Sequence, residues 1–210
     1  MKRILCAVAL TFALAFLTSG TAKAGTIALT AFSGGGLATS GSDQLYGWYF
    51  DTSSAISVTA LGVGDNSGGS GLSLAHDVGI FRVSDEAMLV STTVPAGANA
   101  PIDGFEYVDV SPYSLPADDY VIVMTMPMYN ADTQSLENTS VTTSSPVIYV
   151  NSAFDSGSVL AYPNDANAGL FAEGLFGPNF MFASTSVPEP ASATLILAGG
   201  LGLMFLRRRR

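Results

Sequence analysis

Between positions 25 and 186, apolar and polar residues alternate in short runs, and no run of helix length repeats apolar residues every three or four positions. The runs are rich in Val, Ile, Thr, Tyr and Phe and are separated by Gly, Pro, Asn, Asp and Ser, a pattern typical of β-strands joined by turns. Short strands at this spacing predict an all-β domain, an antiparallel β-sandwich that is jelly-roll-like. The predicted strands are residues 26–32, 44–51, 55–63, 76–83, 87–94, 105–110, 120–126, 147–150, 158–162 and 179–183.

Some segments carry more detailed predictions. The third predicted strand places Ile56, Val58 and Ala60 on one face, because side chains alternate along a strand. The strand at 120–126 (YVIVMTM) is almost continuously apolar, which predicts a position inside a sheet with both faces buried. The polar stretch 131–145 is predicted to be a long loop.

The C-terminal end has a different pattern, an uncharged apolar run that is followed by four arginines. As a helix, the 16 residues of the run at 191–206 span about 24 Å, while a bilayer core is about 30 Å thick. Arginine stems that reach to the interface make up part of this difference, so we predict a short transmembrane helix. The arginines resist translocation and act as a stop-transfer signal, so they stay in the cytoplasm while residues 25–186 lie on the other side of the membrane. They are Arg207, Arg208, Arg209 and Arg210.

Directly before this helix stand Val187, Pro188, Glu189 and Pro190, and the prolines favour an extended, accessible segment at the membrane surface. In the order of its parts, the tail at 187–210 resembles the PEP-CTERM sorting signal of exported bacterial proteins. That resemblance implies processing by an exosortase, a membrane cysteine enzyme, and an association with exopolysaccharide and biofilm in Gram-negative bacteria. The alternative is a plain membrane anchor without processing.

The N-terminal residues 1–24 have the three parts of a secretory signal peptide, with a positive start, an apolar middle and the cleavage pattern Ala22-Lys23-Ala24. The alternative is an uncleaved anchor. The two ends leave 25–186 as one exported domain. The resemblance to PEP-CTERM proteins implies that this domain is anchored in the inner membrane before processing and is then placed at the cell surface or in the extracellular matrix. Cys6 lies in the leader, so this domain has no thiol for a disulfide or a metal.

Charge is distributed unevenly between the ends and the domain. Of the eight basic residues only Arg82 lies within 25–186, against sixteen of the seventeen acidic residues, so the domain has a net charge of −15. This charge excludes nucleic acids and other polyanions as partners, because phosphate binding needs basic residues. It is compatible with solubility alone, with divalent cations or with neutral sugars.

His76 is the only histidine, and no Gly-x-Ser-x-Gly sequence supplies a nucleophilic serine. Asp77 falls on the opposite face of the same predicted strand, so it is not placed to orient the imidazole. The acidic residues form no recognisable motif for glycoside hydrolysis. We therefore expect His76 to be structural or to anchor a loop, and we expect no catalytic residues and no enzymatic activity.

Two binding sites are predicted, each with a simpler alternative. Asp65 and Asn66, in a glycine-rich loop, would supply oxygen ligands to Ca²⁺ together with Asp77; the alternative is a flexible turn, and no other cofactor is indicated. Tyr46 and Trp48 share one face of their predicted strand and would stack on a sugar ring; the alternative is that both belong to the core.

Two functions follow. The first is a non-enzymatic exported protein of the cell surface or extracellular matrix, sorted by an exosortase and associated with exopolysaccharide or biofilm. The second is a carbohydrate-binding module for exopolysaccharide, assisted by calcium. In both, the membrane is contacted through the C-terminal helix before processing, and nucleic acid is not a partner.

Overall fold

The computed structural model describes residues 25–67, 70–97, 101–128, 132–136, 140–164 and 174–184. Within this part of the chain, no helix is long and apolar enough to span a bilayer. The predicted signal peptide at 1–24 and the predicted helix at 191–206 lie outside the described residues. The same holds for the sorting and stop-transfer residues, Val187, Pro188, Glu189, Pro190, Arg207, Arg208, Arg209 and Arg210.

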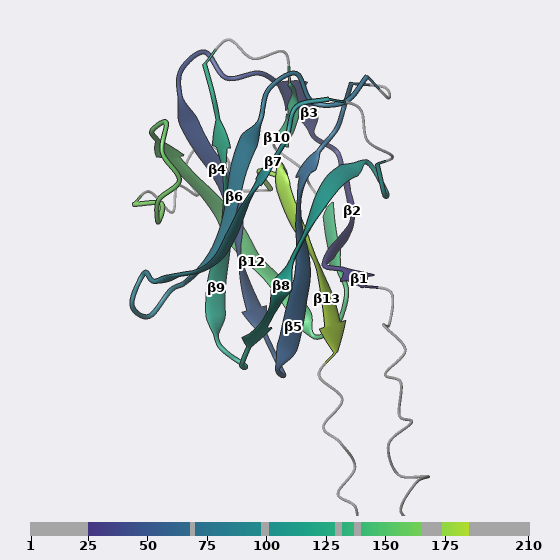
Figure 1. The fold of residues 1–210 in the computed structure, drawn as a ribbon, viewed down its shortest axis with the longest axis vertical. Helices are drawn as coiled ribbons and strands as arrows, with labels where there is room; N and C mark the ends of the chain where they lie inside the picture. Colours follow the sequence, from purple (N-terminus) through teal and green to yellow (C-terminus); the bar gives the residue numbers. More distant parts are fainter. Residues whose placement is uncertain are drawn as a thin grey trace, which may run out of the picture.

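Two antiparallel sheets face each other and form a sandwich (Figure 1). The larger sheet has five strands in the order β12 (Val147–Ser156), β4 (Gln44–Thr52), β9 (Asp119–Met126), β6 (His76–Arg82) and β7 (Met88–Val94). The smaller sheet has four strands in the order β1 (Thr26–Ile27), β13 (Pro178–Ser184), β5 (Ile56–Gly64) and β8 (Phe105–Leu115). The all-β antiparallel class is therefore confirmed, while the jelly-roll-like connectivity stays a prediction.

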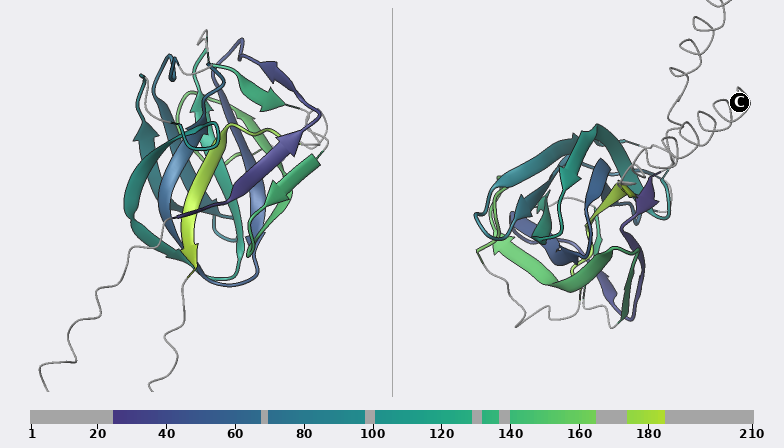
Figure 2. Two further views of the ribbon diagram at one scale, coloured as in Figure 1. Left: turned by 90° about the vertical axis from the view of Figure 1, so that its right-hand side faces the viewer. Right: turned by 90° about the horizontal axis from the view of Figure 1, so that it is seen from below.

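Two short antiparallel ribbons flank the sandwich (Figure 2). One pairs β2 (Leu29–Ser33) with β11 (Ser140–Thr143), and the other pairs β3 (Gly36–Ala38) with β10 (Gln134–Leu136).

Most predicted strands are confirmed, but three stretches differ. The first predicted strand is broken at Ala28 into β1 and β2, because the chain passes there from the four-stranded sheet to the ribbon with β11. Residues 158–162 form no strand; Leu160 and Tyr162 instead pack on the outer face of the five-stranded sheet. The predicted loop at 131–145 contains β10 and β11, because polar segments can pair as ribbons: the side chains of β11 stay partly solvated, whereas Gln134 and Ser135 of β10 are buried.

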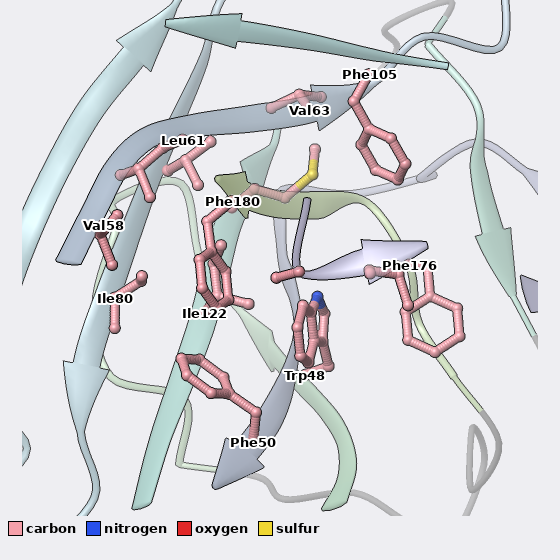
Figure 3. Close-up of a cluster of buried hydrophobic side chains, with 14 of the residues drawn as sticks. Trp48, Phe50, Val58, Leu61, Val63, Ile80, Phe105, Ile122, Phe176 and Phe180 are labelled. Carbon is pink, nitrogen blue, oxygen red and sulfur yellow. The ribbon is translucent and has the colours of Figure 1, made fainter. Parts of the chain in front are cut away.

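Trp48 lies in the main hydrophobic core between the two sheets (Figure 3). Its ring stacks on that of Phe180, with 5.9 Å between the ring centroids and 17° between the ring planes. Its Nε1–H donates a hydrogen bond to the carbonyl oxygen of Pro178 at 2.8 Å, so the buried donor is satisfied. Large aromatic rings dominate the energetics of such cores, and β4 is therefore a central element of this domain.

The prediction for β9 is confirmed, because it is the middle strand of its sheet and seven of its eight residues are buried. One of its faces joins the main core. The other carries Val121 and Val123 into a second, smaller group of buried residues on the outside of the sheet, here called the outer cluster. The outer cluster consists of Leu45, Phe81, Val121, Val123 and Ala153, with Tyr49, Leu160 and Tyr162 packed against it.

The prediction that Ile56, Val58 and Ala60 share a face is wrong. The pairing register of β5 shifts between Val58 and Ala60 against both neighbouring strands, so Thr59 forms a β-bulge. An extra residue reverses the alternation of side chains beyond it. Leu61, rather than Ala60, therefore joins the earlier two residues in the main core.

The close approach of β4 and β9 requires a glycine at position 47. A Cβ added to Gly47 would lie 2.0 Å from the carbonyl oxygen of Ile122. Gly47→Ala is therefore expected to force the strands apart and to lower the free energy of unfolding by about 1–3 kcal/mol, measured by urea denaturation. Gly157→Ala is the matched control, because no atom lies within 4 Å of a Cβ at that position. Equal effects of the two substitutions would contradict this account.

The described chain begins and ends at the same end of the sandwich (Figure 1). Thr26 of β1 lies opposite Phe182 of β13, and Ser184 at the end of β13 pairs with Ile56 at the start of β5. Gly64, where β5 ends, therefore lies at the opposite end together with the loop that follows it. We call these the terminal end and the distal end of the domain.

Candidate functional site

The predicted sugar-stacking pair, Tyr46 and Trp48, belongs to the hydrophobic core. The two side chains share one face of β4, as predicted, and Tyr49 takes the other face. The shared face is packed against the four-stranded sheet, so Tyr46 is only 4% exposed and Trp48 is 0% exposed. The prediction of a stacking platform is therefore wrong, since neither ring presents a face to a ligand.

The residues predicted to bind calcium each contact the protein. Asp65 Oδ1 accepts a hydrogen bond from the Ser67 N–H at 2.8 Å, and Asn66 Nδ2 donates to a backbone carbonyl at 2.8 Å. Asp77 lies on the outer face of β6, where its Oδ1 accepts a hydrogen bond from a threonine hydroxyl of β7 at 2.6 Å. The described residues include no group of three or more His, Cys, Asp or Glu that could hold a metal ion. Asp65 and Asn66 follow β5 of the four-stranded sheet, whereas Asp77 lies on β6 of the five-stranded sheet, so the three predicted ligands come from different sheets.

His76 joins three segments at the distal end. Its Nδ1 lies 2.7 Å from the carbonyl oxygen of Thr125, and because a carbonyl only accepts, Nδ1–H is the donor. Its Nε2 lies 3.0 Å from Asp132 Oδ2. Asp132 also accepts hydrogen bonds from the backbone N–H groups of Ser73, at 2.7 Å, and Leu74, at 3.2 Å. Because the ring is completely buried, this geometry supports the structural, loop-anchoring interpretation of His76.

The carboxyl of Asp132 is the centre of this network. Its burial opposes ionisation, but the hydrogen bonds from Ser73, His76 and Leu74 outweigh burial and hold the pKa of Asp132 below its usual range. Sequence reasoning missed Asp132, because it lies in a polar stretch where no neighbouring residue marks it as the partner of a distant histidine.

A groove of about 250 Å³ on the outer face of the five-stranded sheet is the candidate binding site. It lies near the terminal end, where β9 runs between β4 and β6 and β12 forms the edge of the sheet. Its walls combine a tyrosine ring, aliphatic side chains and polar groups. The lining residues are Tyr49, Asp51, Val83, Asp119, Tyr120, Val150 and Asn151.

Two carboxylates face each other in this groove, since Asp51 on β4 is the direct register partner of Asp119 on β9. Burial, followed by the charge of Asp119, raises the pKa of Asp51. Like charges at directly opposite positions destabilise a sheet. Arg82, the only lysine or arginine of the domain, is held by Asp85, with 2.9 Å between Arg82 Nε and Asp85 Oδ1. A carboxyl group whose pKa is raised by burial and by a neighbouring carboxyl, at the wall of a groove, marks a candidate functional site.

Tyr49 supplies the aromatic wall of the groove and packs against the outer cluster. Burial, together with a hydrogen bond to Tyr162, raises the pKa of Tyr49, so the phenol stays protonated and tied to its neighbour. Sequence reasoning did not select Tyr49. It also missed Asp51 and Asp119, because their positions in the sequence are far apart and only strand pairing brings them together.

No protein-family model matches this chain, and no curated protein matches it. What the groove binds is therefore inferred from its own chemistry. It offers an apolar wall together with the carboxyl groups of Asp51 and Asp119.

Proposed function

We propose that this protein is a non-enzymatic exported protein of the cell surface or extracellular matrix, sorted by an exosortase through its C-terminal tail and associated with exopolysaccharide or biofilm. The observation that carries the proposal is the order of the tail, in which Val187, Pro188, Glu189 and Pro190 precede the apolar run at 191–206 and the four arginines. The leader at 1–24 supports export. Before processing, the C-terminal helix anchors the protein in the inner membrane.

The architecture of the domain fits this role. Its two ends lie together at the terminal end, so a tail attached there would hold the sandwich by one end and direct the distal end away from the membrane. Its net charge of −15 favours solubility outside the membrane. The buried His76, with both ring nitrogens directed at protein acceptors, supports a role without catalysis.

Replacing Pro188, Glu189 and Pro190 with alanine is expected to block processing. The intact mass of the wild-type protein from its native host should lack the leader and Arg207 to Arg210, whereas the variant should keep these arginines and remain in the membrane fraction. Alanine at Ser184 and Ser186 is the matched control, and it should leave the wild-type mass pattern unchanged. A wild-type mass that retains the arginines would establish a plain anchor and remove the support for sorting.

A second candidate function, binding of carbohydrate, is favoured by a different observation, the groove on the outer face of the five-stranded sheet. This function does not depend on Tyr46 and Trp48, which are buried. It needs no calcium, because the groove itself supplies an apolar wall and polar acceptors. It is compatible with sorting, since a matrix protein that binds exopolysaccharide would be retained where the polymer accumulates.

A further inference from the structure

The groove on the outer face of the five-stranded sheet is small, open to solvent and largely apolar. Pockets for drug-sized ligands occupy about 300–1,000 Å³, and this groove, at about 250 Å³, accommodates a smaller group. Tyr49 contributes a half-buried ring, and Val150 contributes an aliphatic side chain that is 53% exposed. Such a surface leaves apolar area in water unless a ligand covers it.

Two carboxyl groups, those of Asp51 and Asp119, stand among the polar groups of the groove. Carboxylate oxygens are hydrogen-bond acceptors, and the Asn151 Oδ1 already accepts a hydrogen bond from the Ser152 N–H at 2.9 Å. A ligand that fits must therefore bring several donors at close spacing together with an apolar face. A sugar ring has both, because adjacent hydroxyl groups lie at its rim and its C–H groups lie on its faces.

We propose that this groove binds one ring of a neutral polysaccharide, with the C–H face of the ring against Tyr49 and Val150 and adjacent hydroxyls donating to Asp51 and Asp119. This inference rests on the proposed carbohydrate-binding function and assigns its site and its class of ligand. Hydroxyl groups that donate hydrogen bonds to both carboxylates would reduce the repulsion between Asp51 and Asp119.

Other ligands fit the same residues less well. Calcium takes six to eight oxygen ligands, whereas only two carboxylates line the groove and much of its wall is apolar. Anionic polymers would meet the charges of Asp51 and Asp119 without a compensating cation, since Arg82 is held by Asp85. A neutral, hydroxyl-rich polymer meets neither difficulty.

Affinity electrophoresis tests the proposal. The full chain, purified in detergent, is run in native gels that contain dextran, galactomannan or alginate. We expect retardation by at least one of the two neutral polymers and none by alginate. Asp119→Asn changes an exposed side chain and should weaken binding about tenfold or more, since a hydrogen bond to a charged group is lost. Tyr49→Leu should weaken binding similarly, while Tyr49→Phe, which keeps the ring, should bind nearly as well as the wild type.

Asp109→Asn is the matched control, because it makes the same change of charge at an exposed position of β8, on the other sheet. It should leave retardation unchanged. The proposal is overturned by no retardation in either neutral polymer, by equal losses in the Asp119 and Asp109 variants, or by preference for alginate. Calorimetry with Ca²⁺ alone that shows Asp119-dependent binding would also overturn it, in favour of a cation site. The binding assay does not depend on processing of the tail. The proposed sugar site can therefore be overturned while the mass of the exported protein still establishes sorting, and sorting can be overturned while the sugar site is established.

Discussion

Replacing Trp48 with alanine is expected to lower the free energy of unfolding by about 3–5 kcal/mol, the usual range for removing a large buried ring. The side chain is 0% exposed, and its ring lies within 6 Å of those of Phe50 and Phe180, at 5.3 and 5.9 Å between centroids. The substitution leaves a cavity between the sheets and removes the donor that satisfies the Pro178 carbonyl. Urea denaturation followed by circular dichroism measures the effect, because Trp48 is the only tryptophan and its fluorescence is lost in the variant.

Two further variants separate the parts of this effect. Trp48→Phe keeps an aromatic ring but removes the indole N–H, so it should cost less than alanine while still costing the hydrogen bond to Pro178. Val159→Ala, at a position that is 74% exposed, should change stability by no more than about 0.5 kcal/mol. Should Trp48→Ala cost no more than Val159→Ala, the ring would not be part of the core, and a role in sugar stacking would be open again.

Trp48 also shows what the sequence could predict and what it could not. The alternation along 44–51 correctly predicted a strand with Tyr46 and Trp48 on one face. It did not indicate whether that face would be covered, because a period of two is the same for an exposed and a buried face. Here the covering residue Phe180 belongs to β13, far along the chain, and meets Trp48 through the packing of one sheet on the other, while Phe176 reaches Trp48 from the segment just before β13.

Local irregularities of the strands could not be predicted from the apolar pattern for a related reason. The bulge at Thr59 changes which residues of β5 face the core, yet it arises from pairing with β13 and β8 rather than from β5 itself. In the same way, the facing carboxylates Asp51 and Asp119 exist only because β4 and β9 pair in one register. The local pattern thus predicted where strands form. It did not predict the register in which they pair, and the candidate site depends on that register.

Removing the carboxylate of Asp132 is expected to destabilise the domain by an amount similar to the loss of Trp48. Leaving a buried hydrogen-bonding group unsatisfied costs about 1–3 kcal/mol, and Asp132→Ala would remove the acceptor of two backbone N–H groups together with the contact to the buried His76. Urea denaturation at neutral pH measures the change. Asp85→Ala, which breaks the exposed pair with Arg82, is the matched control and should have little effect.

The effect of Asp132 on the free energy of unfolding is expected to depend on pH. The pKa of Asp132 is lower in the folded protein than its ordinary value of 3.8. The unfolded chain therefore takes up a proton at this residue at a higher pH than the folded protein does. Its contribution to stability is fully present above about pH 4 and is lost as the pH falls through the folded pKa. The difference in free energy of unfolding between the wild type and Asp132→Ala should accordingly be largest at neutral pH and shrink at acid pH.

A double-mutant cycle between Asp132 and His76 tests whether the two side chains act as a pair. His76→Ala alone should also be strongly destabilising, because it leaves a cavity at a fully buried position and removes the contact with Asp132, which is only 6% exposed. Removing both should cost clearly less than the sum of the single effects, since no buried group is then left uncompensated. Strictly additive losses, or a difference from wild type that does not change with pH, would show that the contact does not hold the loops at the distal end together. A large coupling would establish this pair as the anchor of those loops, a role for the single histidine that is separate from the groove near the terminal end.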